Sequence, residues 1–258
     1  MGYKIKVEDR RGPVDETDLL SGAERFLLFV EQNRRAVLVG LVVLLLVGGG
    51  IGGLLWYDAR NAERAASLTA QAARLQADRP ADQPAKAGEN LKQAIALYRQ
   101  VLDDYPRSPS APLAQFELGN ALMQADDFAG AVQAYSKFIV TYGANKTMLG
   151  LVYQRMGYAH LAAGDKEQAA KAFSAVLEVP GSVNRDQALF ELGKLEEAMG
   201  RPEGAMARYQ ELMKTFPASP FAGEASVRSK SLEAKKGPAA PAEPSADRPP
   251  PATEPAKP

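Results

Sequence analysis

Residues that could carry out chemistry are few in this chain of 258 residues, and their spacing does not bring them into one site. The single histidine, His160, has no cysteine and no second histidine with which to hold a metal ion, because the chain contains no cysteine. The acidic pairs Asp103-Asp104, Asp126-Asp127 and Glu196-Glu197 fall at helix ends, in turns or on a helix surface. Sequence neighbours on a helix point to different faces, so these pairs do not form acid–base dyads. The sequence predicts no enzyme, no metal site and no cofactor.

The glycines and the charges favour neither a phosphate site nor a nucleic-acid site. The densest glycine cluster, Gly48 to Gly53, lies inside an apolar stretch, where a phosphate-cradling loop is not expected. The 31 Lys and Arg residues balance the 31 Asp and Glu residues, whereas a protein that neutralises nucleic-acid phosphates needs a basic surface. We therefore expect protein or peptide partners, recognised through shape and apolar contact.

The apolar stretch over residues 36–57 predicts a transmembrane helix. Its 22 residues carry no charge, and a helix of that length spans about 33 Å, which exceeds the hydrocarbon core of a bilayer. The alternative, a cleaved signal peptide, has a shorter apolar region and does not follow a 35-residue leader. Residues 1–35 form that leader, in which Phe26 to Val30 predict a short amphipathic helix at the membrane surface.

The charges on either side of the span predict its orientation. Lys and Arg prefer the cytoplasmic side, and the leader carries more of them near the membrane, including Arg34 and Arg35. The N-terminus is therefore expected in the cytoplasm and the rest of the chain outside. The spacings Gly48-x-x-x-Gly52 and Gly49-x-x-x-Gly53 predict a face on which another membrane helix packs, although glycine is also simply common in membrane helices.

After the span the sequence repeats itself. An alanine followed four residues later by an aromatic residue recurs at intervals of 37, 38 and 36 residues. A glycine precedes each of the last three alanines by twelve residues. The elements are Ala94/Tyr98, Ala131/Tyr135, Ala169/Phe173 and Ala205/Tyr209, and the glycines are Gly119, Gly157 and Gly193. We interpret each unit as two packed helices, with the glycine and the alanine allowing close approach and the aromatic ring filling the gap between units.

These units resemble the tetratricopeptide repeat, whose unit is about 34 residues long. The resemblance covers residues 88–217, with departures at His160 and Glu196, where the family usually has tyrosine. It implies an all-α solenoid over residues 88–234, with a final capping helix. Residues 58–87 are expected to form a helical linker, because Pro80 and Pro84 interrupt the first helix of the first unit. Residues 235–258, rich in proline, are expected to form a disordered tail.

The resemblance further implies a concave groove lined by the first helix of each unit. Mapped onto this chain, the groove positions are Leu113, Phe116, Asn120, Met123, Leu151, Gln154, Tyr158, Leu161, Phe190, Lys194 and Glu197. This mixture of apolar and aromatic residues with few charges suits an extended or unfolded apolar peptide. The alternative is that several of these side chains pack within the solenoid.

The order of parts also resembles the ancillary subunit of the bacterial Sec translocon, a periplasmic chaperone-like family. The residues that carry this resemblance surround the span: Glu24-Arg25-Phe26, Glu31-x-Asn33, Trp56-Tyr57 and residues 62–68. It implies a single-pass inner-membrane adaptor whose periplasmic repeats handle secreted proteins at the translocon, with periplasmic chaperones as further partners. The Pro-rich tail instead favours a scaffold for cell division or outer-membrane assembly. Both hypotheses leave open whether the chain self-associates.

Overall fold

The computed structural model describes residues 22–236, where all regular secondary structure is helical and no strand occurs. The predicted all-α fold class is confirmed for this part of the chain. The first part of the leader and the Pro-rich tail from residue 237 lie outside the described residues. The chain divides into two compact units, one up to Glu63 and one from Arg64 onward.

The first unit holds α1 (Gly22–Gln32) and the greater part of α2 (Arg34–Ala77). Asn33 separates the two helices and donates from Nδ2 to the carbonyl oxygen of Phe29 at 3.0 Å. Among the described helices, α2 is the one that is long and apolar enough to cross a membrane. Its apolar side chains over residues 38–57 are exposed. Length and composition thus agree with a single span.

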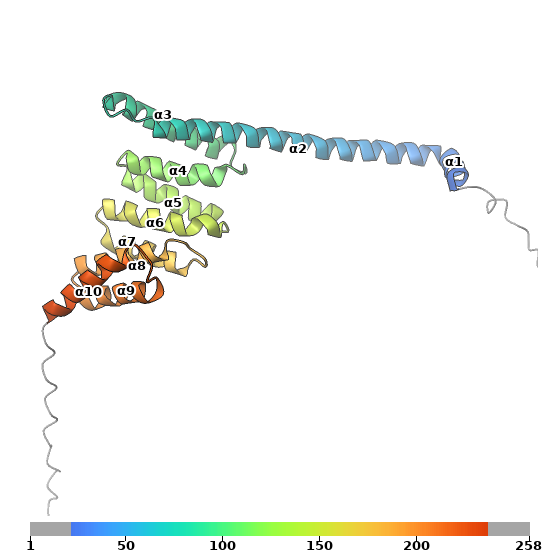
Figure 1. The fold of residues 1–258 in the computed structure, drawn as a ribbon. Coiled ribbons are helices and arrows are strands. Elements are labelled where there is room, and N and C mark those ends of the chain that lie inside the picture. The colour runs from blue at the N-terminus through green and yellow to red at the C-terminus, as the bar shows by residue number, and fades with distance from the viewer. Residues whose placement is uncertain (1–21, 237–258) are drawn as a thin grey trace, which may run out of the picture. The chain divides into compact units, whose positions relative to one another are not determined.

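The second unit is a stack of helices, and Figure 1 shows its layers from α3 to α10. Each helix packs on the next, and α4 also contacts α6. Short connections between packed helices make neighbours antiparallel. The helices are α3 (Pro84–Asp104), α4 (Ala111–Gln124), α5 (Phe128–Tyr142), α6 (Lys146–Ala162), α7 (Lys166–Glu178), α8 (Arg185–Ala198), α9 (Pro202–Thr215) and α10 (Ala222–Lys236).

The repeated glycines and aromatic residues meet inside each helix pair, as the spacing predicts. A Cβ atom on Gly157 would lie 2.8 Å from Cζ of Phe173, and one on Gly119 would lie 2.7 Å from Cζ of Tyr135. Gly193 faces Tyr209 in the same way. The three rings are fully buried. Glycine is therefore required at these positions because the facing ring occupies the space of a side chain.

The turns inside the helix pairs have defined caps. The carboxylate of Asp127 accepts from the backbone N–H of Gly130 at 2.9 Å, and that of Asp165 accepts from Gln168 at 3.0 Å. Each is an N-cap, which satisfies one of the free N–H groups at a helix start. Gly164 and Gly200 precede the second helices of their pairs with φ of +83° and +72°, a conformation that favours glycine.

The first repeat begins earlier than the sequence predicts, within residues 58–87. The end of α2 packs on α3, and Ala65, Thr69 and Ala72 are buried there. The hydroxyl of Tyr98 on α3 donates to Oε1 of Gln76 at 2.9 Å. Residues 64–77 thus act as the first helix of this repeat and not as a linker. Pro80 and Pro84 do not interrupt that helix, because they fall in the turn and at the start of α3.

Candidate protein-binding groove

A pocket of about 240 Å³ opens between the end of α2 and the helices α4 and α6. It lies among the first helices of three successive repeats, and we call it the inner pocket. Its walls are Gln76, Glu117, Asn120, Met123, Gln124, Tyr135, Arg155 and Tyr158. The structure therefore brings together three of the predicted groove residues, Asn120, Met123 and Tyr158.

Hydrogen bonds hold the floor of the inner pocket. The hydroxyl of Tyr135 donates to Oδ1 of Asn120 at 2.8 Å, and Nδ2 of Asn120 donates to Oε2 of Glu117 at 3.2 Å. Burial raises the pKa of Tyr135 well above its usual value of about 10, so this hydroxyl remains a donor at neutral pH. The side-chain amide of Asn120 accepts one hydrogen bond, from Tyr135, and donates another, to Glu117. The two bonds fix its orientation.

Arg155 differs from the floor of the inner pocket because its charged side chain is exposed. Within residues 22–236 the structure records no ion pair or hydrogen bond for its guanidinium. It lies close enough to favour ionisation of the hydroxyls of Tyr135 and Tyr158, against the larger effect of burial. A ligand side chain with a carboxylate or a carbonyl group could accept hydrogen bonds from it.

A second polar cluster joins α6 to α8. The hydroxyl of Tyr158 donates to Oε1 of Glu191 at 3.3 Å and accepts from Nε2 of Gln187 at 2.8 Å. Nζ of Lys194 pairs with Glu191 at 2.9 Å. Burial, and then the negative charge of Glu191, raise the pKa of Tyr158 to about 12. The predicted groove residues Tyr158 and Lys194 therefore belong to one hydrogen-bonded network.

Several predicted groove residues pack within the solenoid. Phe116 and Phe190 are 5% and 4% exposed and contact the rings of Tyr135 and Tyr209. Gln154 is buried, and its Oε1 accepts from Nδ2 of Asn184 at 2.8 Å. These three side chains hold one helix on another.

The remaining predicted positions are more open. Leu113 and Leu151 are 45% and 36% exposed, which leaves apolar surface on α4 and α6. Leu161 is half-buried and packs on the core cluster around Phe173. Glu197 accepts a hydrogen bond from the hydroxyl of Tyr209 and lies 3.5 Å from Nη1 of Arg228. Arg228 lies on α10, so Glu197 joins the last repeat to the final helix.

Four residues that line the inner pocket are not among the predicted groove positions: Gln76, Glu117, Gln124 and Arg155. Gln76 is missed because residues 58–87 are assigned to a linker. On α4, however, Glu117, Asn120 and Gln124 follow each other at spacings of three and four residues, which is the signal of one helix face. The pocket is consequently more polar than the predicted set of residues suggests. Among the described residues, no group of His, Cys, Asp and Glu side chains could hold a metal ion.

Comparison with known families supports the repeat architecture. A family model described as tetratricopeptide repeat matches residues 85–145 and 155–220, and a second model with the same description matches residues 54–108. Together they cover more than half of the chain. The second match includes the end of α2, in agreement with its packing as the first helix of a repeat.

Individual proteins show the same likeness. A "TPR repeat-containing protein" of Treponema pallidum is 27% identical over 218 residues, which are 78% of this chain and 90% of that protein. A putative kinesin light chain of Podospora anserina with TPR-like repeats aligns with a TM-score of 0.51 at 18% identity, over 68% of this chain and 88% of the other. The crystal structure of MamA aligns at 20% identity with a TM-score of 0.43, over 60% and 92%. The structural likenesses concern the fold alone.

Proposed function

The chain belongs to the tetratricopeptide-repeat family, and from this premise we propose that it is a membrane-anchored, non-enzymatic adaptor whose inner pocket binds extended protein segments. Repeats of this family are protein-interaction scaffolds, which gives the chain a protein-binding role. The anchor is the apolar segment over residues 36–57, and the groove continues from the inner pocket along α6 and α8.

The observation that carries the binding site is the composition of the inner pocket. Its floor is satisfied by hydrogen bonds among the groove residues themselves, so a ligand need not desolvate unpaired polar groups there. Met123 offers an adaptable apolar contact, and Leu151 adds exposed apolar surface on α6. Arg155 supplies a charge that can bond to ligand carbonyl or carboxylate groups. Such a surface accepts extended segments of varied sequence.

The membrane part of the proposal rests on α2 and on the residues that flank its apolar stretch. The resemblance to the Sec ancillary subunit implies that the chain lies in the bacterial inner membrane with its repeats in the periplasm. There the repeats receive secreted polypeptides as these emerge from the translocon. A reporter that is active only in the periplasm, fused to the C-terminus, should therefore be active. A signal from a cytoplasm-specific reporter instead would refute the orientation.

Site-specific photo-crosslinking tests the binding site. A benzophenone side chain in place of Met123 should crosslink to secretory polypeptides in transit, because it lies in the wall of the inner pocket. The matched control replaces Val140, which is 87% exposed on α5 and does not line the inner pocket. Equal crosslinking from both positions, or none from Met123, would contradict the proposal.

A replacement and a deletion test the membrane helix and the C-terminal tail separately. Replacing residues 36–57 with an unrelated membrane span should abolish co-purification with the translocon, if the face formed by Gly48, Gly49, Gly52 and Gly53 contacts another membrane helix. Retained co-purification would refute the role of the glycine face and would not affect the proposal for the groove.

Deleting residues 237–258 should leave crosslinking at Met123 unchanged. Loss on deletion would favour the competing hypothesis of an envelope scaffold that acts through its tail.

A further inference from the structure

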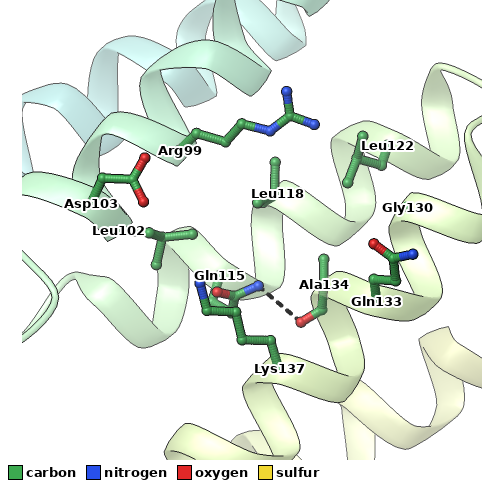
Figure 2. Close-up of a pocket in the computed structure, with 10 residues that line it drawn as sticks. All are labelled: Arg99, Leu102, Asp103, Gln115, Leu118, Leu122, Gly130, Gln133, Ala134 and Lys137. Atoms are coloured by element: carbon green, nitrogen blue, oxygen red, sulfur yellow. Dashed lines mark hydrogen bonds between the residues drawn. The ribbon is translucent and has the colours of Figure 1, made fainter.

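A second pocket, of about 270 Å³, lies between α3, α4 and α5. We call it the outer pocket, and Figure 2 shows the side chains around it. Arg99, Leu102 and Asp103 come from α3, and Gln115, Leu118 and Leu122 come from α4. Gly130, Gln133, Ala134 and Lys137 come from α5.

The outer pocket and the inner pocket use different faces of α4. Gln115, Leu118 and Leu122 face the outer pocket, and Glu117, Asn120 and Gln124 face the inner one. Both sets follow the spacing of a single helix face, and they are offset by two residues, which is about 200° of rotation. A ligand in one pocket therefore leaves the other accessible.

The outer pocket has an apolar floor and a charged rim. Leu102, Leu118 and Leu122 are 5–8% exposed in the floor. Arg99 and Lys137 are exposed on opposite helices, and Figure 2 shows the Arg99 guanidinium extending over the pocket. Neither has an ion pair within the described residues.

The third rim charge, Asp103, is also unpaired among residues 22–236. The rim therefore carries a net positive charge, which is complementary to an acidic ligand. The carboxylate of Asp103 reduces this positive charge.

Gln115 provides a second and independent indication of a ligand. Its side chain is 1% exposed, and Nε2 donates to the carbonyl oxygen of Ala134 at 2.9 Å, the dashed line in Figure 2. Its Oε1 is buried without a hydrogen-bond partner in the described part of the chain. A buried acceptor without a donor is unfavourable and rare in folded proteins. An N–H group of a ligand in this pocket would satisfy it.

We propose that the outer pocket binds an acidic segment of a partner protein that also carries an aliphatic side chain. The aliphatic side chain fills the floor between Leu118 and Leu122, and the carboxylate lies between Arg99 and Lys137. A backbone N–H of the segment donates to Oε1 of Gln115 when this side chain turns toward the pocket. This site is independent of the function proposed above for the inner pocket.

Selection from a library of short random peptides tests this proposal, with the full chain in lipid nanodiscs as the target. Enriched peptides should combine Asp or Glu with Leu, Ile, Val or Met. In the Arg99→Glu/Lys137→Glu variant, the affinity of a synthetic peptide from that pool should fall by about tenfold or more, since two exposed attractions become repulsions. The Asp103→Asn variant should bind more tightly, because it removes a like charge. This gain cannot result from misfolding.

The matched control is Arg155→Glu, which reverses another exposed charge, in the inner pocket. It should leave the affinity of the selected peptides unchanged. Loss of affinity in this variant, with no loss in the Arg99→Glu/Lys137→Glu variant, would assign the peptides to the inner pocket and overturn the proposal. Enrichment of basic peptides or of none would also overturn it. Self-association of the chain would overturn the proposal as well, if the rim substitutions abolish it. A second copy of the chain would then occupy the outer pocket.

Discussion

The substitution Gly157→Ala tests the glycine–aromatic packing that recurs in the last three repeats. The new Cβ atom would lie 2.8 Å from Cζ of Phe173 and 2.9 Å from Cε1 and Cε2. Carbon atoms in contact are normally about 3.5–4.0 Å apart, so the ring has to move by more than half an ångström. Phe173 is fully buried and its ring also contacts Tyr158 edge to face, with centroids 5.2 Å apart. The added methyl group therefore strains two helices at once.

The expected cost follows from two opposing effects. Overfilling a packed core costs about 1–3 kcal/mol, whereas alanine in place of glycine within a helix stabilises it by about 0.5–1 kcal/mol. The net loss in the free energy of unfolding is therefore about 0–2.5 kcal/mol, with a central value of about 1 kcal/mol. For a urea dependence of about 2 kcal/mol per molar, that central value lowers the midpoint by about 0.5 M.

The control substitution is Gly88→Ala on α3, where an added Cβ would meet nothing within 4 Å. There only the gain in helix propensity remains, so the midpoint should rise. Urea unfolding of the full chain in detergent micelles, followed by far-UV circular dichroism, compares the two variants. The reasoning is refuted if Gly157→Ala raises the midpoint as Gly88→Ala does.

Three further outcomes follow from contacts in the repeats. Tyr209→Phe removes the hydroxyl that donates to Glu197 and should lower the free energy of unfolding by about 1 kcal/mol; an unchanged urea midpoint would show that this bond adds nothing. Asp127→Ala removes the N-cap of α5 and should cost about 1 kcal/mol, whereas Asp127→Asn should retain most of the stability. Burial raises the folded pKa of Tyr158 to about 12, so the contribution of this tyrosine is complete below the unfolded value of about 10 and is lost as the pH rises through 12. Burial raises the pKa of Tyr135 as well. Circular dichroism and tyrosinate absorbance recorded together should therefore change together above pH 10, and free titration of these tyrosines in a folded chain at pH 10 would contradict their burial.

The sequence predicts the helix pairs well because their packing depends on contacts at fixed spacing. Gly157 and Phe173 lie sixteen residues apart on paired helices, and the same separation recurs in the neighbouring units. Such a recurring spacing can be recognised in the sequence without knowledge of the fold. The start of the first repeat has no such recurring spacing. The helix that crosses the predicted membrane segment continues to Ala77 without a break, so composition gives no boundary at residue 64.

The polarity of the groove could be predicted only in part, because its hydrogen bonds join different helices and different repeats. Tyr158 on α6 bonds to Glu191 on α8, thirty-three residues away, and Gln154 bonds to Asn184. From the sequence, each of these side chains is equally compatible with a core position and with a groove position. Their roles depend on the rotation of one helix relative to the next, which the repeat spacing alone does not determine.

The central claim is that the groove beginning at the inner pocket binds extended protein segments, and an affinity measurement tests it most directly. The ligand is a secretory precursor kept unfolded, and the full chain is held in lipid nanodiscs. The Met123→Glu/Leu151→Glu variant places two carboxylates on this surface and should bind about tenfold more weakly or worse. The control Val140→Glu adds one carboxylate at an exposed site on α5, outside the groove, and should bind as the wild type does. Equal affinity of all three proteins would contradict the claim.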